Sequence, residues 1–381
     1  MLVRGDIRLS GAVMAHPARR GRAQDLVERH PELGLRIALD PRPSAPATAL
    51  RAAREAWASC ADDATHHLVL QDDAVLRDDF PDALLDLIRA RPADALCLFA
   101  EWGGLAANAV RLAALLGHAW AEVVGEYVPS VGLVLPAPVA RGFGAYLDTA
   151  DTTGPESTDD VALMGYLRSS GVSAYVPVGG PVEHGDAPSL VGNERQGRRQ
   201  AVCDVPVDPS RKSTLTETGA LSHLWWLQGT AFLYFADARA PGGWRREPAD
   251  QVLAAGGLPA GEVMAALRER LDASADPKAL RDIVSDVLLR EVWLSSVLLG
   301  CLAGEHNRSA PAPVPADVAL RDASVRRALA TLAPGGLRRF VPDHRLDDLA
   351  VLAEPVVRAG VEYGWGREAG VLEFATRAAA P

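Results

Sequence analysis

Short apolar runs alternate with longer amphipathic stretches through the first half of the chain. Short apolar runs are typical of buried strands, whereas apolar positions that recur every three or four residues are typical of helices. Strands are predicted at 11–15, 35–39, 68–70, 95–99 and 172–178, an extended segment at 123–135, and helices at 23–29, 48–59, 79–88, 106–116, 139–147 and 161–167. This alternation predicts an α/β fold with a mostly parallel sheet that helices cover on both faces.

The pattern changes after residue 205. The segment 215–235 is rich in Trp and Phe, and we expect an apolar helix packed on the first domain, with an aromatic acceptor-binding groove as the alternative. Further helices are predicted at 248–255, 261–271, 277–289, 292–302, 316–332, 344–353 and 355–363. The chain is therefore expected to form an α/β domain over 1–205 and a mainly α-helical accessory domain over 206–381.

Two adjacent carboxylates end the third predicted strand. Asp72 and Asp73 follow the apolar run 68–70 and Gln71. Acids at the carboxyl end of a strand lie where α/β sheets bind their ligands. Hard oxygen ligands there suit Mg²⁺ or Mn²⁺ together with a phosphate group. The alternative is a solvated turn in which one of the two acids starts the next helix.

A second acidic pair and a histidine follow later in the chain. Asp159 and Asp160 precede the helix at 161–167, where they could cap the helix or take a proton from an acceptor hydroxyl. His184 follows the last predicted strand and precedes a loop, 185–193, with the Gly and Ser residues to wrap a phosphate. Imidazole is an accepted ligand in Mn²⁺ sites, although a surface histidine is the alternative.

Charge and composition exclude several classes of protein. The formal net charge of −10 argues against a nucleic-acid-binding protein. Neither GxGxxG nor GxxxxGK[ST] is present, which argues against a dehydrogenase or a P-loop enzyme. The four cysteines form no CxxC pair and are expected to be buried free thiols in a reducing cytoplasm. Signal-peptide and membrane-spanning runs are also missing from the sequence, so we expect a cytoplasmic protein without a transmembrane segment.

In their order and spacing, these segments resemble a bacterial glycosyltransferase of the GT-A fold, over roughly residues 10–200. The resemblance implies that residues 1–205 are a nucleotide-sugar-binding catalytic domain. It implies that Gln71-Asp72-Asp73 stands at the DXD position, which holds a divalent metal on the donor diphosphate. Gln71 departs from the pattern. Because an amide cannot offset metal charge, Asp73 would be the main protein ligand, together with His184, and Asp72 would face the ribose or the sugar.

The same resemblance assigns the remaining site residues. The nucleotide would be held by Pro17 and by Arg19 or Arg20 after the first strand, and by Asp40 after the second strand. Trp102 would lie near the sugar or the acceptor. Asp160 matches the general base of inverting members, with Asp159 as its neighbour.

The expected function is therefore a glycosyltransferase that uses Mn²⁺ or Mg²⁺ and a nucleoside-diphosphate sugar. The acceptor hydroxyl could belong to a small natural product, a peptide or a glycan. Only Asp160 points to inversion, so retention stays open. The alternatives are a nucleotidyltransferase, which releases pyrophosphate, and a non-catalytic nucleotide-binding scaffold that lost the first DXD acid. The C-terminal helices would bind the acceptor or form a homo-oligomer.

Overall fold

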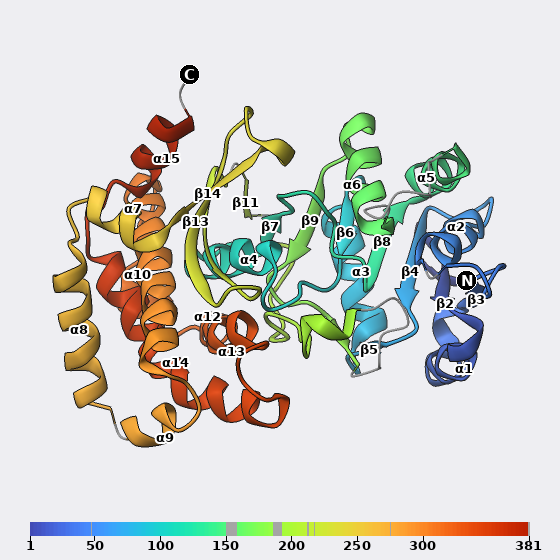
Figure 1. Ribbon diagram of the computed structural model, residues 1–381. Coiled ribbons are helices and arrows are strands. Elements are labelled where there is room, and N and C mark those ends of the chain that lie inside the picture. Colours follow the sequence, from blue (N-terminus) through green and yellow to red (C-terminus); the bar gives the residue numbers. More distant parts are fainter. Residues whose placement is uncertain are drawn as a thin grey trace.

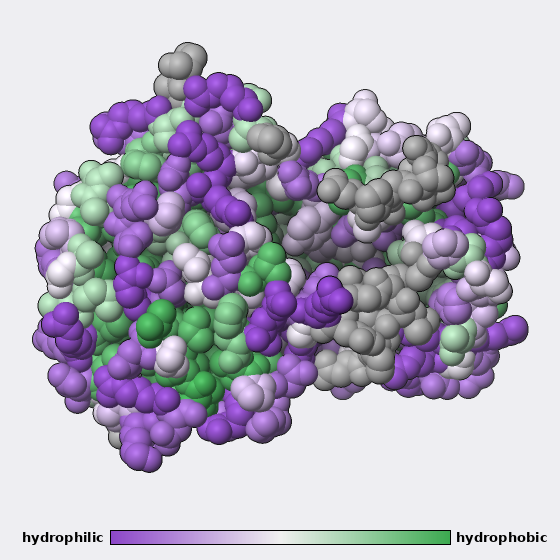
Figure 2. Space-filling view, in the orientation of Figure 1, coloured by the Kyte–Doolittle hydropathy of each residue, from purple (hydrophilic) through white to green (hydrophobic). Residues whose placement is uncertain are grey.

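The computed structural model describes residues 1–46, 48–149, 158–185, 193–211, 213–216, 218–274 and 276–379. The chain forms an α/β part around a central sheet, on the right of Figure 1, and a C-terminal part of helices and a small sheet on the left. In the space-filling view the outline narrows between the two parts (Figure 2). The α/β class that the sequence predicts is confirmed.

The central sheet of the described chain is mixed. Its strands lie in the order β1-β2-β4-β8-β6-β9-β7-β11, and β3 also pairs with β2. The bounds are β1 Leu2–Arg4, β2 Ile7–Ala15, β3 Arg36–Leu39, β4 His66–Gln71, β6 Ala95–Cys97, β7 Trp120–Glu122, β8 Gly132–Pro136, β9 Ala174–Pro177 and β11 Thr214–Leu215. Strands β2, β3, β4, β6 and β9 run in one direction, and the others run against them. The antiparallel strand β8 separates β4 from β6.

Helices cover both faces of this sheet, as the sequence predicts. They are α1 Arg20–Arg29, α2 Leu50–Ala58, α3 Phe80–Ala90, α4 Leu105–Leu115, α5 Ala137–Thr149 and α6 Asp159–Ser170. Successive residues of a strand face opposite sides. In β4, Leu68 and Leu70 therefore belong to the core shared with α1 and α3, while Val69 belongs to the core shared with α2, α4, α5 and α6.

The aromatic segment expected to be a helix is instead a β-hairpin. Strands β12 (Ala220–Trp225) and β13 (Thr230–Ala236) pair antiparallel, and β14 (Trp244–Pro248) completes a three-stranded sheet. The chain reverses at Gly229, whose backbone is left-handed with φ of 61°. Because glycine adopts this conformation at little cost, the turn splits one apolar run into two strands. Strand β11, which lies beyond the expected domain boundary at 205, pairs with β7 in the central sheet.

The C-terminal helices are α7 Ala249–Ala255, α8 Ala260–Asp272, α9 Pro277–Arg281, α10 Asp286–Ser309, α11 Ala316–Ala319, α12 Ala323–Ala330, α13 Leu332–Leu337, α14 Leu346–Trp365 and α15 Val371–Ala379. They differ from the predicted ones in three places: α9 and α10 divide 277–309 at a different point, α11 to α13 replace one helix at 316–332, and α14 joins two predicted helices. Helix α10 begins at Asp286 because the Ser285 hydroxyl caps it by accepting the Leu288 N–H. Helix α14 continues through Pro355. The carbonyl that proline leaves unpaired is that of Val351, which is 74% exposed and open to water.

Helix α10 is the centre of the C-terminal part. By length and composition it could cross a membrane, but 83% of its most apolar stretch is buried inside the protein, as in the core helix of a soluble protein. It packs closely against α14 through glycines on both helices. A Cβ atom added at Gly364 would collide with the Val297 carbonyl, and one added at Gly300 with the Val361 carbonyl. Glycine at these positions lets the two backbones touch.

We predict that Gly364→Ala lowers the free energy of unfolding by about 2–3 kcal/mol, because the new methyl group overpacks the α10–α14 contact. Gly165 in α6 is the matched control, since a Cβ there meets no atom within 4 Å. Gly165→Ala should raise the free energy of unfolding by about 0.5–1 kcal/mol through helix propensity. Urea denaturation of both variants measures the two effects, and equal shifts of the same sign would contradict the close-packing argument.

Candidate functional site

The strand order of the central sheet reverses at β2. The chain passes from β2 to β3 on one side of it, and β4 then pairs with its other side. Met14, near the end of β2, lies opposite Gln71 at the end of β4. Open α/β sheets bind ligands at such a reversal, outside the carboxyl ends of the strands. The segments that leave β2 and β4 at this point carry several of the expected site residues.

Arg19 joins these two segments. Pro17 opens the short 3₁₀ helix η1 (Pro17–Arg19) directly after β2. The Arg19 Nη1 donates to Asp72 Oδ1 at 3.0 Å and to Asp73 Oδ2 at 3.4 Å. The side chain of Arg19 is only 15% exposed, and those of the two acids are 7% and 6% exposed. Arg20 is exposed, so Arg19 is the arginine that faces the acids.

His184 lies beside Asp73, as expected of a shared site. Strand β5 (Ala74–Leu76) pairs with β10 (Val182–His184), and this ribbon puts His184 opposite Ala74. His184 Nε2 is 3.4 Å from Asp73 Oδ2. Among the described residues, Asp73 Oδ1 and both ring nitrogens of His184 are buried without a hydrogen-bond partner. The expected phosphate loop after His184 lies outside the described residues over 186–192.

Buried polar atoms without partners carry a large desolvation cost, which a ligand can relieve. An unpaired carboxylate oxygen beside an unpaired imidazole nitrogen fits a divalent cation that accepts both kinds of ligand. The described ranges contain no group of three or more His, Cys, Asp or Glu side chains that could hold a metal ion by themselves. Mg²⁺-type cations are commonly held by one or two carboxylates together with substrate phosphates. The pair therefore fits a cation that a phosphate ligand also holds.

The two aspartates differ in charge state. Burial acts to raise the pKa of Asp73, but His184, Arg199 and Arg19 outweigh it and hold the pKa below its usual value. Burial raises the pKa of Asp72, and the charge of Asp73 adds to this effect, against the opposing Arg19. Asp73 is thus the more strongly ionised member of the pair. Arg199 belongs to the Arg-rich stretch 194–199.

Asp40 closes β3 next to the site, and its backbone N–H donates to Ala15 O at the end of β2. Both carboxylate oxygens already accept bonds from Arg51, each at 2.8 Å, and Oδ1 also accepts the Arg42 N–H. The bond from Arg51 holds the pKa of Asp40 below its usual value. A nucleotide at Asp40 would therefore have to compete with Arg51.

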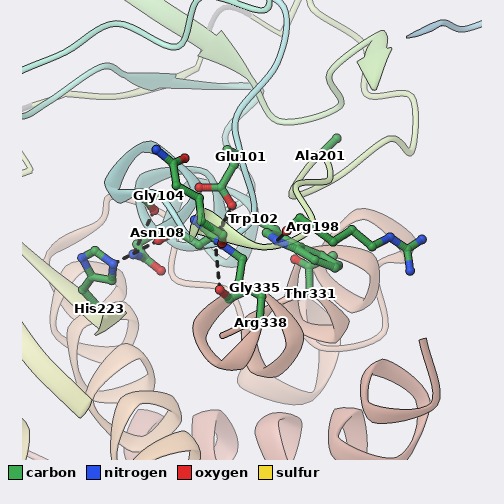
Figure 3. Close-up of polar contacts among 12 residues, drawn as sticks. Glu101, Trp102, Gly104, Asn108, Arg198, Ala201, His223, Thr331, Gly335 and Arg338 are labelled. Atoms are coloured by element: carbon green, nitrogen blue, oxygen red, sulfur yellow. Dashed lines mark hydrogen bonds and ion pairs between the residues drawn. The ribbon is translucent and has the colours of Figure 1, made fainter. Parts of the chain in front are cut away.

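Trp102, which was expected to lie near the sugar or the acceptor, is a buried residue. It is 1% exposed, and its Nε1–H donates to the carbonyl of Arg198 at 3.1 Å (Figure 3). The residue beside it, Glu101, is the polar one. Glu101 accepts the N–H of Gly103 and forms an ion pair with Arg338 from the C-terminal part. Arg338 also lies over the ring of Trp226, with its guanidinium carbon 4.5 Å from the ring centroid.

Sequence reasoning missed Glu101 and Arg338 as parts of one cluster. They lie 237 positions apart. Arg338 is one of many arginines in the second half, and no spacing marks it. One local feature could have pointed to this cluster, namely the strand-to-helix turn at Gly103 and Gly104 that follows Glu101.

Asp159 and Asp160 begin α6. Burial raises the pKa of Asp159 to about 7, and the charge of Asp160 adds to it. Asp160 is only half-buried, and its Oδ1 accepts the Val161 N–H at 2.9 Å within the first turn of the helix. Burial raises the pKa of Tyr127, and the charges of Glu101 and Asp160 add to this shift.

The charge of Arg199 acts on Asp73 and on Arg338. Four of the expected site residues are in contact: Arg19, Asp72, Asp73 and His184.

No family model matches this chain, and no curated protein sequence matches it either.

Asp159 makes stability depend on pH. Its folded pKa of about 7 exceeds the ordinary 3.8, so the folded protein holds this proton more tightly than the unfolded chain. The free energy of unfolding should therefore fall as pH rises from about 4 to about 7. We predict that Asp159→Asn removes part of this fall and stabilises the protein more at pH 8 than at pH 5.

Thermal melts from pH 4.5 to 8.5 measure this effect, with Asp25→Asn on the exposed face of α1 as the control. An Asp159→Asn variant whose melting temperature tracks that of the wild type at every pH would show that Asp159 is ionised throughout.

Proposed function

We propose that the protein is a metal-assisted glycosyltransferase of the GT-A type, which moves a sugar from a nucleoside-diphosphate sugar to an acceptor hydroxyl. One observation carries the proposal. Asp73 and His184 lie side by side, with buried atoms that have no partner among the described residues, at the sheet edge where the strand order reverses. Arg19 and Arg199 supply positive charge beside them. Such a site suits a cation and a diphosphate together.

In the proposed reaction, Arg19 and Arg199 hold the phosphate oxygens of the donor. Asp73 and His184 would hold a Mn²⁺ or Mg²⁺ ion, which supplies charge neutralisation for the leaving diphosphate when it is bound. Asp72 faces the ribose or the sugar, where its raised pKa favours hydrogen bonding to a hydroxyl group. Asp160 accepts the proton of the acceptor hydroxyl as its oxygen bonds to the anomeric carbon and the bond from that carbon to the diphosphate breaks. A single displacement of this kind inverts the anomeric configuration, and the nucleoside diphosphate leaves.

Gln71 bears on the strength of metal binding. Its Nε2 donates to the Ser130 hydroxyl at 3.2 Å, so the amide is bonded to the segment before β8. The first position of the DXD-like motif therefore makes a structural contact. This feature favours the second candidate, a nucleotide-binding scaffold without catalysis.

A nucleotidyltransferase would use the same site but release pyrophosphate, and analysis of the released product separates it from sugar transfer.

We predict that at least one nucleoside diphosphate raises the melting temperature by several degrees in the presence of Mn²⁺. Saturation at 100 times the dissociation constant adds about 2.7 kcal/mol to the free energy of unfolding. A thermal-shift panel of UDP, GDP, ADP, CDP and dTDP, each with and without Mn²⁺, measures the effect. Asp73→Asn should abolish the part that needs Mn²⁺, whereas the exposed control Asp25→Asn should not. If none of these nucleotides changes the melting temperature, the proposed donor site is wrong.

We predict that Asp160→Asn lowers the rate of sugar transfer by about 10²–10⁴-fold, because the general base is lost. The thermal shift by the donor nucleotide should stay unchanged, since Asp160 does not contact the diphosphate in this proposal. Transfer assays with the nucleotide identified by the panel measure the rate. Wild-type transfer by Asp160→Asn would mean that Asp160 only caps α6 and would reopen the retaining mechanism.

The remaining proposals concern partners and location. The C-terminal part contributes Arg338 and Trp226 next to Glu101, so we propose that it helps to bind the acceptor. Apolar surface lies over its helices in Figure 2. Val287 and Phe340 of this part are exposed, which suits a homo-oligomer through this part. The four buried free cysteines suit a reducing cytoplasm.

A further inference from the structure

Arg19 holds both acids of the candidate site at once. One guanidinium nitrogen donates to Asp72 at 3.0 Å and to Asp73 at 3.4 Å. All three side chains are largely buried, so water screens this contact weakly. Arg22 and Arg199 add positive charge, since the first acts on Asp72 and the second on Asp73. Three guanidinium groups therefore act on two carboxylates.

This excess of positive charge opposes a bare divalent cation. A cation that approached Asp73 Oδ1 and His184 would meet the Arg19 guanidinium on the other oxygen of the same carboxylate. Like charges at that separation repel strongly in a partly buried site. Gln71 adds to the effect because it supplies no third negative charge. Without further anions, the site favours the arginine over the metal.

A diphosphate reverses this balance. It brings several negative oxygens, and a guanidinium binds phosphate oxygens in a planar, bidentate manner that matches its geometry. Arg19 can then exchange its carboxylate contacts for phosphate contacts, which leaves Asp73 free to bind the cation. The cation and the diphosphate also attract each other. Each ligand therefore improves the site for the other, and this coupling is reciprocal by thermodynamic necessity.

We propose that Arg19 makes metal binding conditional on the diphosphate. It occupies Asp72 and Asp73 when no nucleotide is bound, and it moves to the phosphate oxygens when the diphosphate enters. This inference rests on the proposed function of the site as a metal-diphosphate centre. It adds that the metal and the donor bind as a coupled pair, and that a single arginine produces the coupling.

Two binding measurements with opposite expected signs test the proposal. Mn²⁺ alone is titrated into the full-length protein and followed by the loss of its free-ion paramagnetic resonance signal. Inorganic pyrophosphate alone is titrated by calorimetry without metal. Relative to wild type, Arg19→Gln should bind Mn²⁺ at least tenfold more tightly and pyrophosphate at least tenfold more weakly. Arg29→Gln, an exposed arginine at the other end of α1, should stay within twofold of wild type for both.

The outcomes separate this inference from the proposed function. If wild type binds both probes and Arg19→Gln leaves Mn²⁺ affinity within twofold, Arg19 does not control the metal and the inference fails while the function stands. If neither protein binds Mn²⁺ or pyrophosphate, the proposed metal-diphosphate site itself fails. An equal effect of Arg29→Gln would assign the change to overall charge and would also overturn the inference.

Arg19→Lys covers the case in which Arg19→Gln does not fold, as judged by circular dichroism and melting temperature. The ammonium keeps the charge, but it ends one bond short of the Nη1 position that contacts both acids, and it lacks the planar fork that binds phosphate oxygens. It should bind Mn²⁺ more tightly than wild type, by about threefold or more, and pyrophosphate more weakly. Wild-type affinity for both probes in Arg19→Lys would overturn the specific role of the guanidinium.

Discussion

The site depends on the pairing of two buried aspartates with a largely buried arginine side chain. Asp72 and Asp73 end β4 inside the protein, where an isolated carboxylate is strongly disfavoured. Arg19 compensates them from the end of β2, and His184 approaches from the β5–β10 ribbon. These contacts hold together segments that leave the sheet at its point of strand reversal. Among the described residues, Asp73 Oδ1 and the ring nitrogens of His184 have no hydrogen-bond partner, and these atoms support the proposal of a ligand site beside this charge cluster.

The C-terminal part is joined to the α/β part by a second set of buried polar contacts, centred on α4. Arg111 in α4 donates to the carbonyls of Trp102 and Ala328, to the Thr331 hydroxyl and to the Asn108 side chain. Burial lowers the pKa of Arg111 to about 9, and these acceptors stabilise its charge. Ala328 and Thr331 belong to the α12 region, so one side chain links both parts. The Glu101 ion pair with Arg338 lies in the same region (Figure 3).

This arrangement relates the C-terminal part to the candidate site. The segment that carries Glu101 and Trp102 follows β6, whose carboxyl end lies at the same edge as those of β2 and β4. Its shape is set by contacts with α13 and with residues 196–200. A Cβ atom at Gly103 would collide with Arg338 and the Gly335 carbonyl, so glycine is needed for the close approach. The C-terminal part thus packs directly against the segment that follows β6.

The sequence by itself determined the α/β class, most helices of the first half and the strand that ends on Asp72 and Asp73. Local periodicity and turn residues suffice for these features, because they depend on near neighbours in the chain. Only the tertiary structure decided that Arg19 contacts both acids, that Trp102 is buried, that 215–235 forms a hairpin and that α14 continues through Pro355. These outcomes depend on partners far away in the sequence, such as Arg198 for Trp102 and Gly335 for Gly103. Packing and charge compensation between distant segments decide them, and local pattern carries no information about such contacts.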